Sequence, residues 1–206
     1  MKIAAFLPLS LCDYPGKVAA VVFTQGCNFN CPWCHNRHLI PYEAMDTKPL
    51  SEEDVLGTLS ERLGRLGGVV VSGGEPTIQS DLPEFLAKLK ETGIAVKLDT
   101  NGSNPDVVEH CIREKLVDFI AMDVKAPWDK YDKLTGIADS ATNPIRTMEI
   151  IATSGIHHQF RTTRVEPLLT ESDFASIAAT IPPGSPHVWQ ELRACNSFKA
   201  SGASGA

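Results

Sequence analysis

The chain has 206 residues, of which 43% are hydrophobic and 21% charged, and its formal net charge is −6. This length and composition are typical of one globular domain, and the acidic balance with scattered Lys and Arg argues against a nucleic-acid partner or an anionic membrane surface. Apolar runs stay below the roughly 18 residues that span a bilayer, and three of six cysteines lie within residues 27–34, which favours metal binding in the reducing cytoplasm over a disulfide framework.

The first residues, 3–12, are apolar but interrupted by Pro8, and they lead into a polar turn at 13–16. A secretory signal would need a longer apolar region and a better cleavage site, so none is expected. Beyond this segment, short β-rich runs predict six strands, at residues 18–24, 69–71, 94–98, 117–124, 157–165 and 188–192, and the first of them is a continuous apolar run.

Helices are expected between these strands. Capping residues and helical periodicity place their starts at Ser51, at Ser80 or Asp81, at Pro105, near Asn143 and at Thr170. The first of them should bury a face formed by Val55, Leu59 and Leu63.

Strands that alternate with helical crossovers imply a parallel sheet, and about six β/α units fall short of the eight in a closed barrel. We therefore predict an α/β fold, an incomplete (open) parallel β/α barrel, within a single domain over residues 1–196. Residues 197–206 are rich in Ser, Gly and Ala and are predicted to be a disordered tail or a cloning remnant.

Cys27, Cys31 and Cys34 form a C-x3-C-x2-C segment directly after the first predicted strand. Three thiols on so short and polar a loop cannot all be core residues. One interpretation is a structural zinc site completed by His35 or His38, although zinc sites usually combine two cysteine pairs and the chain has no second pair. The other is an iron–sulfur cluster, in which three thiolates leave one of four irons open to a substrate. The carboxyl end of a barrel strand is where such folds place their chemistry.

A second motif, Gly73-Gly74-Glu75, follows the second predicted strand. Two glycines allow a ligand to approach the backbone closely, and the carboxylate beside them can receive an ammonium group. An ordinary glycine-rich turn between a strand and a helix is the alternative.

Charged side chains mark the ends of later strands, where they are costly unless paired, liganded or exposed at the rim. They are Asp99 with Thr100 after the third strand, Asp123 and Lys125 after the fourth, and Arg161 within the fifth. Arg161 fits the same rim, and a salt bridge on the strand face is its alternative role.

On these residues the chain resembles the radical S-adenosylmethionine (SAM) superfamily. In that family the C-x3-C-x2-C loop holds a [4Fe-4S] cluster whose open iron is chelated by the amino and carboxylate groups of SAM. The resemblance implies reductive cleavage of SAM to methionine and a 5′-deoxyadenosyl radical. It also implies that Gly73, Gly74 and Glu75 bind the amino group of the SAM methionine.

A closer resemblance, over nearly the whole chain, is to the glycyl-radical-enzyme activating proteins, particularly the activase of anaerobic ribonucleotide reductase. It is carried by the segments 13–17, 25–27, 34–36, 98–102 and 122–125. It implies that Asp99, Thr100 and Asp123 line the SAM site together with a monovalent cation, and that Lys125 and Arg161 contact the methionine carboxylate or the ribose. Trp33 matches the aromatic position near the adenine, with core packing as its alternative.

The resemblance further implies that the 5′-deoxyadenosyl radical removes a hydrogen atom from a glycine of a partner enzyme, with anaerobic ribonucleotide reductase favoured, and that flavodoxin or ferredoxin supplies the electron. Two other functions remain open: a radical SAM enzyme acting on a small molecule or a peptide, and a non-catalytic metal-binding module. The chain has no further cysteine-rich insertion, and Cys12, Cys111 and Cys195 are not expected to be ligands.

Overall fold

The computed structural model of the protein describes residues 1–43, 49–166 and 168–192. The prediction for residues 197–206, and the position of Cys195, lie outside these ranges. Within them, no helix is long and apolar enough to cross a membrane.

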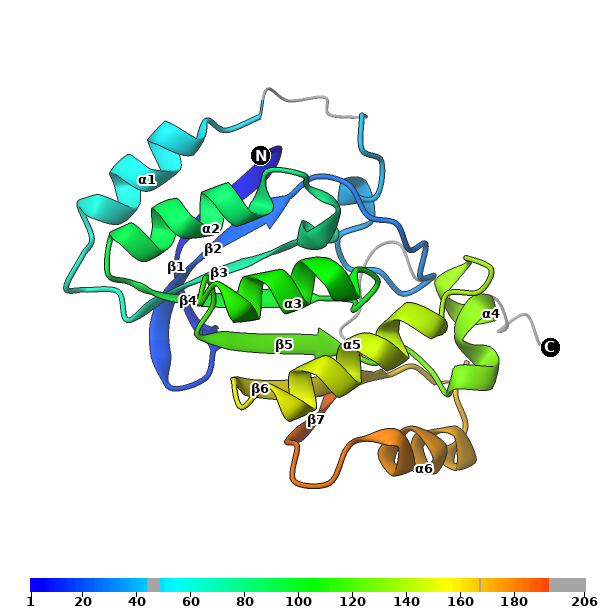
Figure 1. The fold of residues 1–206 in the computed structure, drawn as a ribbon. Coiled ribbons are helices and arrows are strands. Elements are labelled where there is room, and N and C mark those ends of the chain that lie inside the picture. The colour runs from blue at the N-terminus through cyan, green and yellow to red at the C-terminus, as the bar shows by residue number, and fades with distance from the viewer. Residues whose placement is uncertain (44–48, 167, 193–206) are drawn as a thin grey trace.

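One curled, seven-stranded sheet organises the chain, with the strands in the order β1 to β7 (Figure 1). Its strands are β1 (Ile3–Tyr14), β2 (Lys17–Thr24), β3 (Gly68–Gly73), β4 (Ala95–Thr100), β5 (Phe119–Asp123), β6 (His157–Arg164) and β7 (His187–Glu191). Strands β2 to β7 run parallel to one another, so the predicted open barrel with six parallel strands is confirmed.

The sequence analysis missed β1, which pairs antiparallel with β2 through the turn at Pro15 and Gly16. Proline is tolerated in a strand at the edge of a sheet, where a missing N–H breaks no ladder, so Pro8 did not prevent strand formation. Register shifts within the β1–β2 pair also interrupt the simple alternation by which a strand is recognised.

The predicted helices are present as α1 (Glu52–Ser60), α2 (Leu82–Glu91), α3 (Pro105–Arg113), α5 (Thr142–Thr153) and α6 (Glu171–Thr180). The side chain of Ser51 caps α1, and Thr170 forms a reciprocal capping box with Asp173 at α6. Leu63 was expected on the buried face of α1, but the helix ends at Ser60 and Leu63 is 44% exposed.

Shorter helical segments were not predicted, because they are too short to show a period. They are α4 (Tyr131–Thr135) and three single 3-10 turns, η1 (Arg37–Leu39), η2 (Pro76–Ile78) and η3 (Trp128–Lys130).

Two apolar clusters hold the sheet. The larger lies between the sheet and the helices α1, α2, α3 and α5, which cover one of its faces (Figure 1), and contains Val71, Leu98 and Ile120. The smaller fills the inside of the curl near the amino ends of the strands, with Tyr14 and Val70 among its members. The space that remains inside the curl therefore lies at the carboxyl ends of the strands.

Candidate functional site

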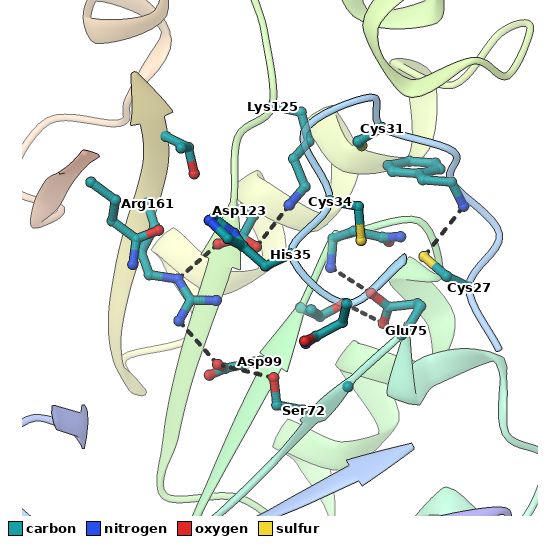
Figure 2. A pocket seen from close by; sticks show the side chains of 18 of the residues that line it. Cys27, Cys31, Cys34, His35, Ser72, Glu75, Asp99, Asp123, Lys125 and Arg161 are labelled. Atoms are coloured by element: carbon teal, nitrogen blue, oxygen red, sulfur yellow. Dashed lines mark hydrogen bonds and ion pairs between the residues drawn. The ribbon is translucent and has the colours of Figure 1, made fainter. Parts of the chain in front are cut away.

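A cavity of about 740 Å³ lies inside the curl of the sheet. All twelve site residues predicted from the sequence line it: Cys27, Cys31, Trp33, Cys34, Gly73, Gly74, Glu75, Asp99, Thr100, Asp123, Lys125 and Arg161. Figure 2 shows the three cysteines and Glu75 on one side of the cavity and Arg161, Asp99 and Asp123 on the other. The cavity also reaches the two edge strands, where Cys12 and Asp13 of β1 and Gln190 and Glu191 of β7 line it.

The cysteine loop begins where β2 ends. Its first turn is held by backbone hydrogen bonds, from Gly26 N to Leu39 O (2.7 Å) and from Cys27 N to Ile40 O (3.0 Å). The backbone N–H of Phe29 donates to the sulfur of Cys27 at 3.4 Å. Burial raises the pKa of the Cys27 thiol to about 12, although this hydrogen bond acts in the opposite direction.

Burial likewise raises the pKa of Cys31, and the ammonium of Lys125 opposes that shift. One N–H group at Cys27 and one ammonium near Cys31 thus favour the thiolate form, but burial outweighs both. Metal binding requires thiolates and releases their protons, and three thiols on one loop are a donor set that fits an iron–sulfur cluster.

Polar side chains that the sequence analysis missed hold the middle of this loop through hydrogen bonds. Asn28 donates to Ser103 Oγ at 2.8 Å and accepts from Asn101 Nδ2 at 3.0 Å, which ties the loop to the segment after β4. Arg37 donates to the carbonyl of Cys31 at 3.2 Å and to the side chain of Asn30 at 2.9 Å. The position of Asn28 between two cysteines was the available signal, but its partners are 73 and 75 residues away.

A single-ion site would be a different arrangement, with three or more ligands converging on one point. No group of His, Cys, Asp or Glu side chains within the described ranges has that geometry. A multinuclear cluster does not require such convergence, because each thiolate binds its own iron.

Gly73 and Gly74 serve the packing of the chain itself. A Cβ added to Gly74 would lie 1.9 Å from the carbonyl oxygen of Gly26, and one added to Gly73 would lie 2.2 Å from Thr24 N. Gly73 also has a φ of +124°, which side chains rarely adopt. These two glycines let the end of β3 press against the backbone from which the cysteine loop starts.

Glu75 is buried, with 1% of its surface exposed, and its carboxylate receives four hydrogen bonds. Oε1 accepts from the N–H and hydroxyl of Thr77 (3.1 and 2.6 Å) and from the Thr100 hydroxyl (2.7 Å), and Oε2 accepts from Asn101 N (2.6 Å). Burial raises the pKa of Glu75, while these four donors favour the ionised form. The carboxylate thus joins the turn after β3 to the end of β4.

The charged residues form one continuous ladder across β4, β5 and the neighbouring β6. Asp99 accepts from Lys97 and from Arg161 (3.0 Å), and Asp123 accepts from Arg161 (2.7 Å) and Lys125 (2.9 Å) (Figure 2 draws the pairs other than that of Lys97). Burial by itself would raise the pKa of Asp123, but Arg161 and Lys125 outweigh it and hold that pKa well below its usual range.

The same ladder disagrees with the monovalent cation expected near Asp99, Thr100 and Asp123. Each of the four carboxylate oxygens already accepts from a cationic nitrogen. The Thr100 hydroxyl donates to Glu75 and accepts from Gly102 N. A metal ion at these oxygens would therefore lie against the positive charges of Lys97, Arg161 and Lys125, and these residues do not fit a metal ion.

Trp33 packs in the core, as the alternative interpretation predicted, and its place near the adenine stays a prediction. It is 3% exposed and belongs to the larger apolar cluster, and it also lines the cavity. Of the remaining cysteines in the described ranges, Cys111 is buried in that same cluster, whereas Cys12 is exposed at the mouth of the cavity.

Comparison with known proteins agrees with this architecture. Residues 21–180 match the model of the radical SAM superfamily. Solved structures with the same fold include Streptococcus suis SuiB bound to S-adenosylmethionine (TM-score 0.64, 15% identity, covering 84% of this chain and 40% of that one). Another is anSMEcpe with bound AdoMet (TM-score 0.62, 16% identity, 82% and 48%). At these identities the likeness concerns the fold alone.

Sequence relatives are more informative. MJ1227 of Methanocaldococcus jannaschii, whose name assigns it to the glycyl-radical enzyme activating enzymes, is 33% identical over 184 residues, covering 87% of this chain and 75% of its own. The pyruvate formate-lyase-activating enzyme of Staphylococcus aureus is 34% identical over 146 residues, and the match spans about half of its length (55%) and 62% of this chain. The chain belongs to the radical SAM superfamily and, within it, to the glycyl-radical enzyme activating enzymes.

Proposed function

We propose that this chain cleaves S-adenosylmethionine reductively and uses the resulting 5′-deoxyadenosyl radical to generate a glycyl radical on a partner enzyme. The observation that carries the proposal is the convergence of three thiols and a cationic ladder in one cavity. Its volume, about 740 Å³, lies within the range of about 300–1,000 Å³ that is usual for small-molecule sites. Family membership and the relatives named for glycyl-radical activation support the same reaction.

In this proposal Cys27, Cys31 and Cys34 each bind one iron of a [4Fe-4S] cluster, which supplies the electron and an open iron for SAM. The N–H groups of Arg161 and Lys125 attract the carboxylate of the SAM methionine or its ribose, because they carry positive charge at the rim.

Asp99 and Asp123 orient those two cations through the ion pairs described above, and Trp33 offers a ring face to the adenine. Glu75 has one accepting bond at Oε2 and so retains capacity for the SAM ammonium beside the backbone of Gly73 and Gly74. No monovalent cation is included, because the oxygens that would bind it already face the cationic nitrogens of the ladder.

For the partner we propose anaerobic ribonucleotide reductase, with flavodoxin or ferredoxin as the electron donor, in the cytoplasm. The ribonucleotide reductase proposal rests on the resemblance of the motif segments at 13–17, 25–27, 34–36, 98–102 and 122–125. Pyruvate formate-lyase is the partner that the names of the S. aureus relatives suggest. The glycine-bearing segment would enter where the cavity meets the edge strands β1 and β7.

The chemistry is tested by anaerobic reconstitution with iron and sulfide, reduction with dithionite, and quantification of 5′-deoxyadenosine after SAM addition. Cys31→Ala should lose the product, whereas Cys111→Ala, which removes a buried thiol outside the cavity, should retain it. Zinc uptake without cluster formation in the wild type would instead identify a metal-binding module.

The partner is tested by electron paramagnetic resonance. The reduced, SAM-loaded protein is mixed in turn with anaerobic ribonucleotide reductase and with pyruvate formate-lyase, and the glycyl radical doublet is integrated. A doublet only with pyruvate formate-lyase would refute the ribonucleotide reductase assignment. Production of 5′-deoxyadenosine without a doublet on either protein would favour a small-molecule or peptide substrate.

A further inference from the structure

Lys97 is a charged residue in the middle of the sheet, and the sequence analysis did not single it out. It is fully buried, with 0% of its surface exposed. Its register partners are Val70 of β3 and Phe119 of β5, both in the apolar cluster that fills the amino-end half of the curl. The lysine stem therefore crosses an apolar layer, and its ammonium contacts the carboxylate of Asp99, two residues further along the same strand face.

The ammonium of Lys97 is the second cationic partner of Asp99. The ladder contains three cationic groups and two carboxylates, so its net charge is +1. Without Lys97 the net charge would be zero, and Asp99 would keep Arg161 but one of its two oxygens would lose its cationic partner. A buried carboxylate oxygen without a partner is costly, so a cation is favoured at this place.

We infer that the Lys97 ammonium does in this chain the electrostatic work that a bound monovalent cation was expected to do. Lys97 pairs with Oδ1 of Asp99, which leaves Oδ2 to accept from Arg161 and orient it toward the cavity. Lys97 is thus a positioning residue, because it acts on the ligand through Asp99 and Arg161. Resting on the proposed function, the inference predicts SAM binding that does not depend on sodium or potassium.

The test removes the internal cation and offers external ones in its place. Lys97→Met keeps the apolar stem, and Lys97→Ala leaves a space that ammonium or methylammonium can enter. The matched control is Lys90→Met, which removes another lysine–aspartate pair, with Asp118, at the other end of the sheet. The dissociation constant of SAM is measured on each reconstituted holoenzyme in potassium, sodium, ammonium, methylammonium and tetramethylammonium chloride at equal ionic strength.

Wild type and Lys90→Met should bind SAM with dissociation constants that differ less than about twofold among the salts, since about 0.4 kcal/mol corresponds to that ratio. Both Lys97→Met and Lys97→Ala should bind SAM about tenfold more weakly in tetramethylammonium, which is too large to enter. Potassium, ammonium or methylammonium should recover most of the loss in Lys97→Ala, which has space for the ion, and little of it in Lys97→Met. A wild type that requires potassium overturns the inference, and so does a Lys97→Ala variant whose affinity is either unchanged or lost in every salt.

A second readout keeps the inference separate from the proposed function. The melting temperature of each cluster-free protein is recorded in the same salts without SAM. Ammonium or potassium should raise the melting temperature of Lys97→Ala relative to tetramethylammonium and should leave wild type and Lys90→Met unchanged. If wild type binds no SAM in any salt, the proposed function fails, and this salt response alone then decides the role of Lys97.

Discussion

Glu75 gives the sharpest test of the site's construction. Its buried carboxylate receives four hydrogen bonds from fixed or nearly fixed donors, two of them backbone N–H groups. Glutamine has the same size, but one of its two oxygens is replaced by an NH2 group. In either orientation that NH2 group faces a donor instead of providing an acceptor.

The magnitude follows from the better of the two orientations. If the glutamine oxygen takes the Oε1 position, the NH2 group faces Asn101 N, and one buried N–H loses its acceptor at a cost of about 1–3 kcal/mol. The three remaining bonds lose their charge assistance, while removal of a buried charge returns part of its desolvation cost. We expect Glu75→Gln to lower the free energy of unfolding by about 2 kcal/mol net, equivalent to a melting temperature about 4–8 °C lower in a chain of this size.

The assay is denaturant unfolding of the reduced, cluster-free protein at neutral pH, with Glu149→Gln as a control at an exposed position of α5. The control should be within about 0.5 kcal/mol of wild type, as surface substitutions usually are. Unchanged stability in Glu75→Gln would refute the structural role. If SAM affinity fell at unchanged stability, Glu75 would be a direct ligand of the SAM ammonium and nothing more.

Three further predictions concern the surroundings of the site. Gly74→Ala should fail to yield soluble folded protein, because the added Cβ would lie 1.9 Å from Gly26 O. The control Gly57→Ala in α1, where an added Cβ meets nothing within 4 Å, should be more stable than wild type in denaturant titrations by up to about 1 kcal/mol. Asn28→Ala should lose iron from the reconstituted cluster to a chelator about tenfold faster than wild type, because two hydrogen bonds of about 0.5–1.5 kcal/mol each are removed. An unchanged rate would contradict the role of Asn28 in holding the cysteine loop. The Lys130 ammonium and the cap of α6 lower the pKa of Asp173 to about 2, so the ionised carboxylate stabilises the fold above the unfolded pKa and this contribution disappears as the pH falls. Asp173→Asn should therefore melt at a lower temperature near neutrality, and its melting temperature should fall less steeply than that of wild type between about pH 4 and 2. An equally steep fall in the variant would contradict this role of Asp173.

The sequence predicted those parts of the fold that local signals determine. Ser51 and Thr170 are caps whose residue types satisfy the first N–H groups of a helix, and both cap as expected. Strands β2 to β5 were recognisable because strands buried on both faces read as largely apolar runs. β6 and β7 are more polar and more exposed, and their place in the alternation of strands and helices was the signal for them. β1 was missed because it is an edge strand with Pro8 and irregular register, and its pairing with β2 rather than its composition makes it a strand.

The sequence predicted which residues form the site, but not which of their side chains pair with one another. Parallel strands present their carboxyl ends at one edge of the sheet, so residues after successive strands were expected to meet, and they line one cavity. Which charge meets which depends on the register between strands, such as Asp123 opposite Arg161, and no local pattern encodes that register. For the same reason Lys97 went unnoticed, although a lysine two residues before Asp99 in an apolar strand was a usable signal.

The network around Glu75 changes how the Gly-Gly-Glu motif is understood in this chain. Gly74 packs against the backbone that precedes Cys27, Glu75 binds Asn101 N, and the Asn101 side chain returns to Asn28 between the first two cysteines. The motif therefore completes a network of contacts that connects the ends of β2, β3 and β4. The position of the cysteine loop depends on every residue of this network. Loss of cluster or SAM binding in a Glu75 variant would consequently not identify a ligand by itself. Besides the stability measurement, comparison with Asn28→Ala, which disrupts the same network without changing the carboxylate, separates direct binding from displacement of the loop.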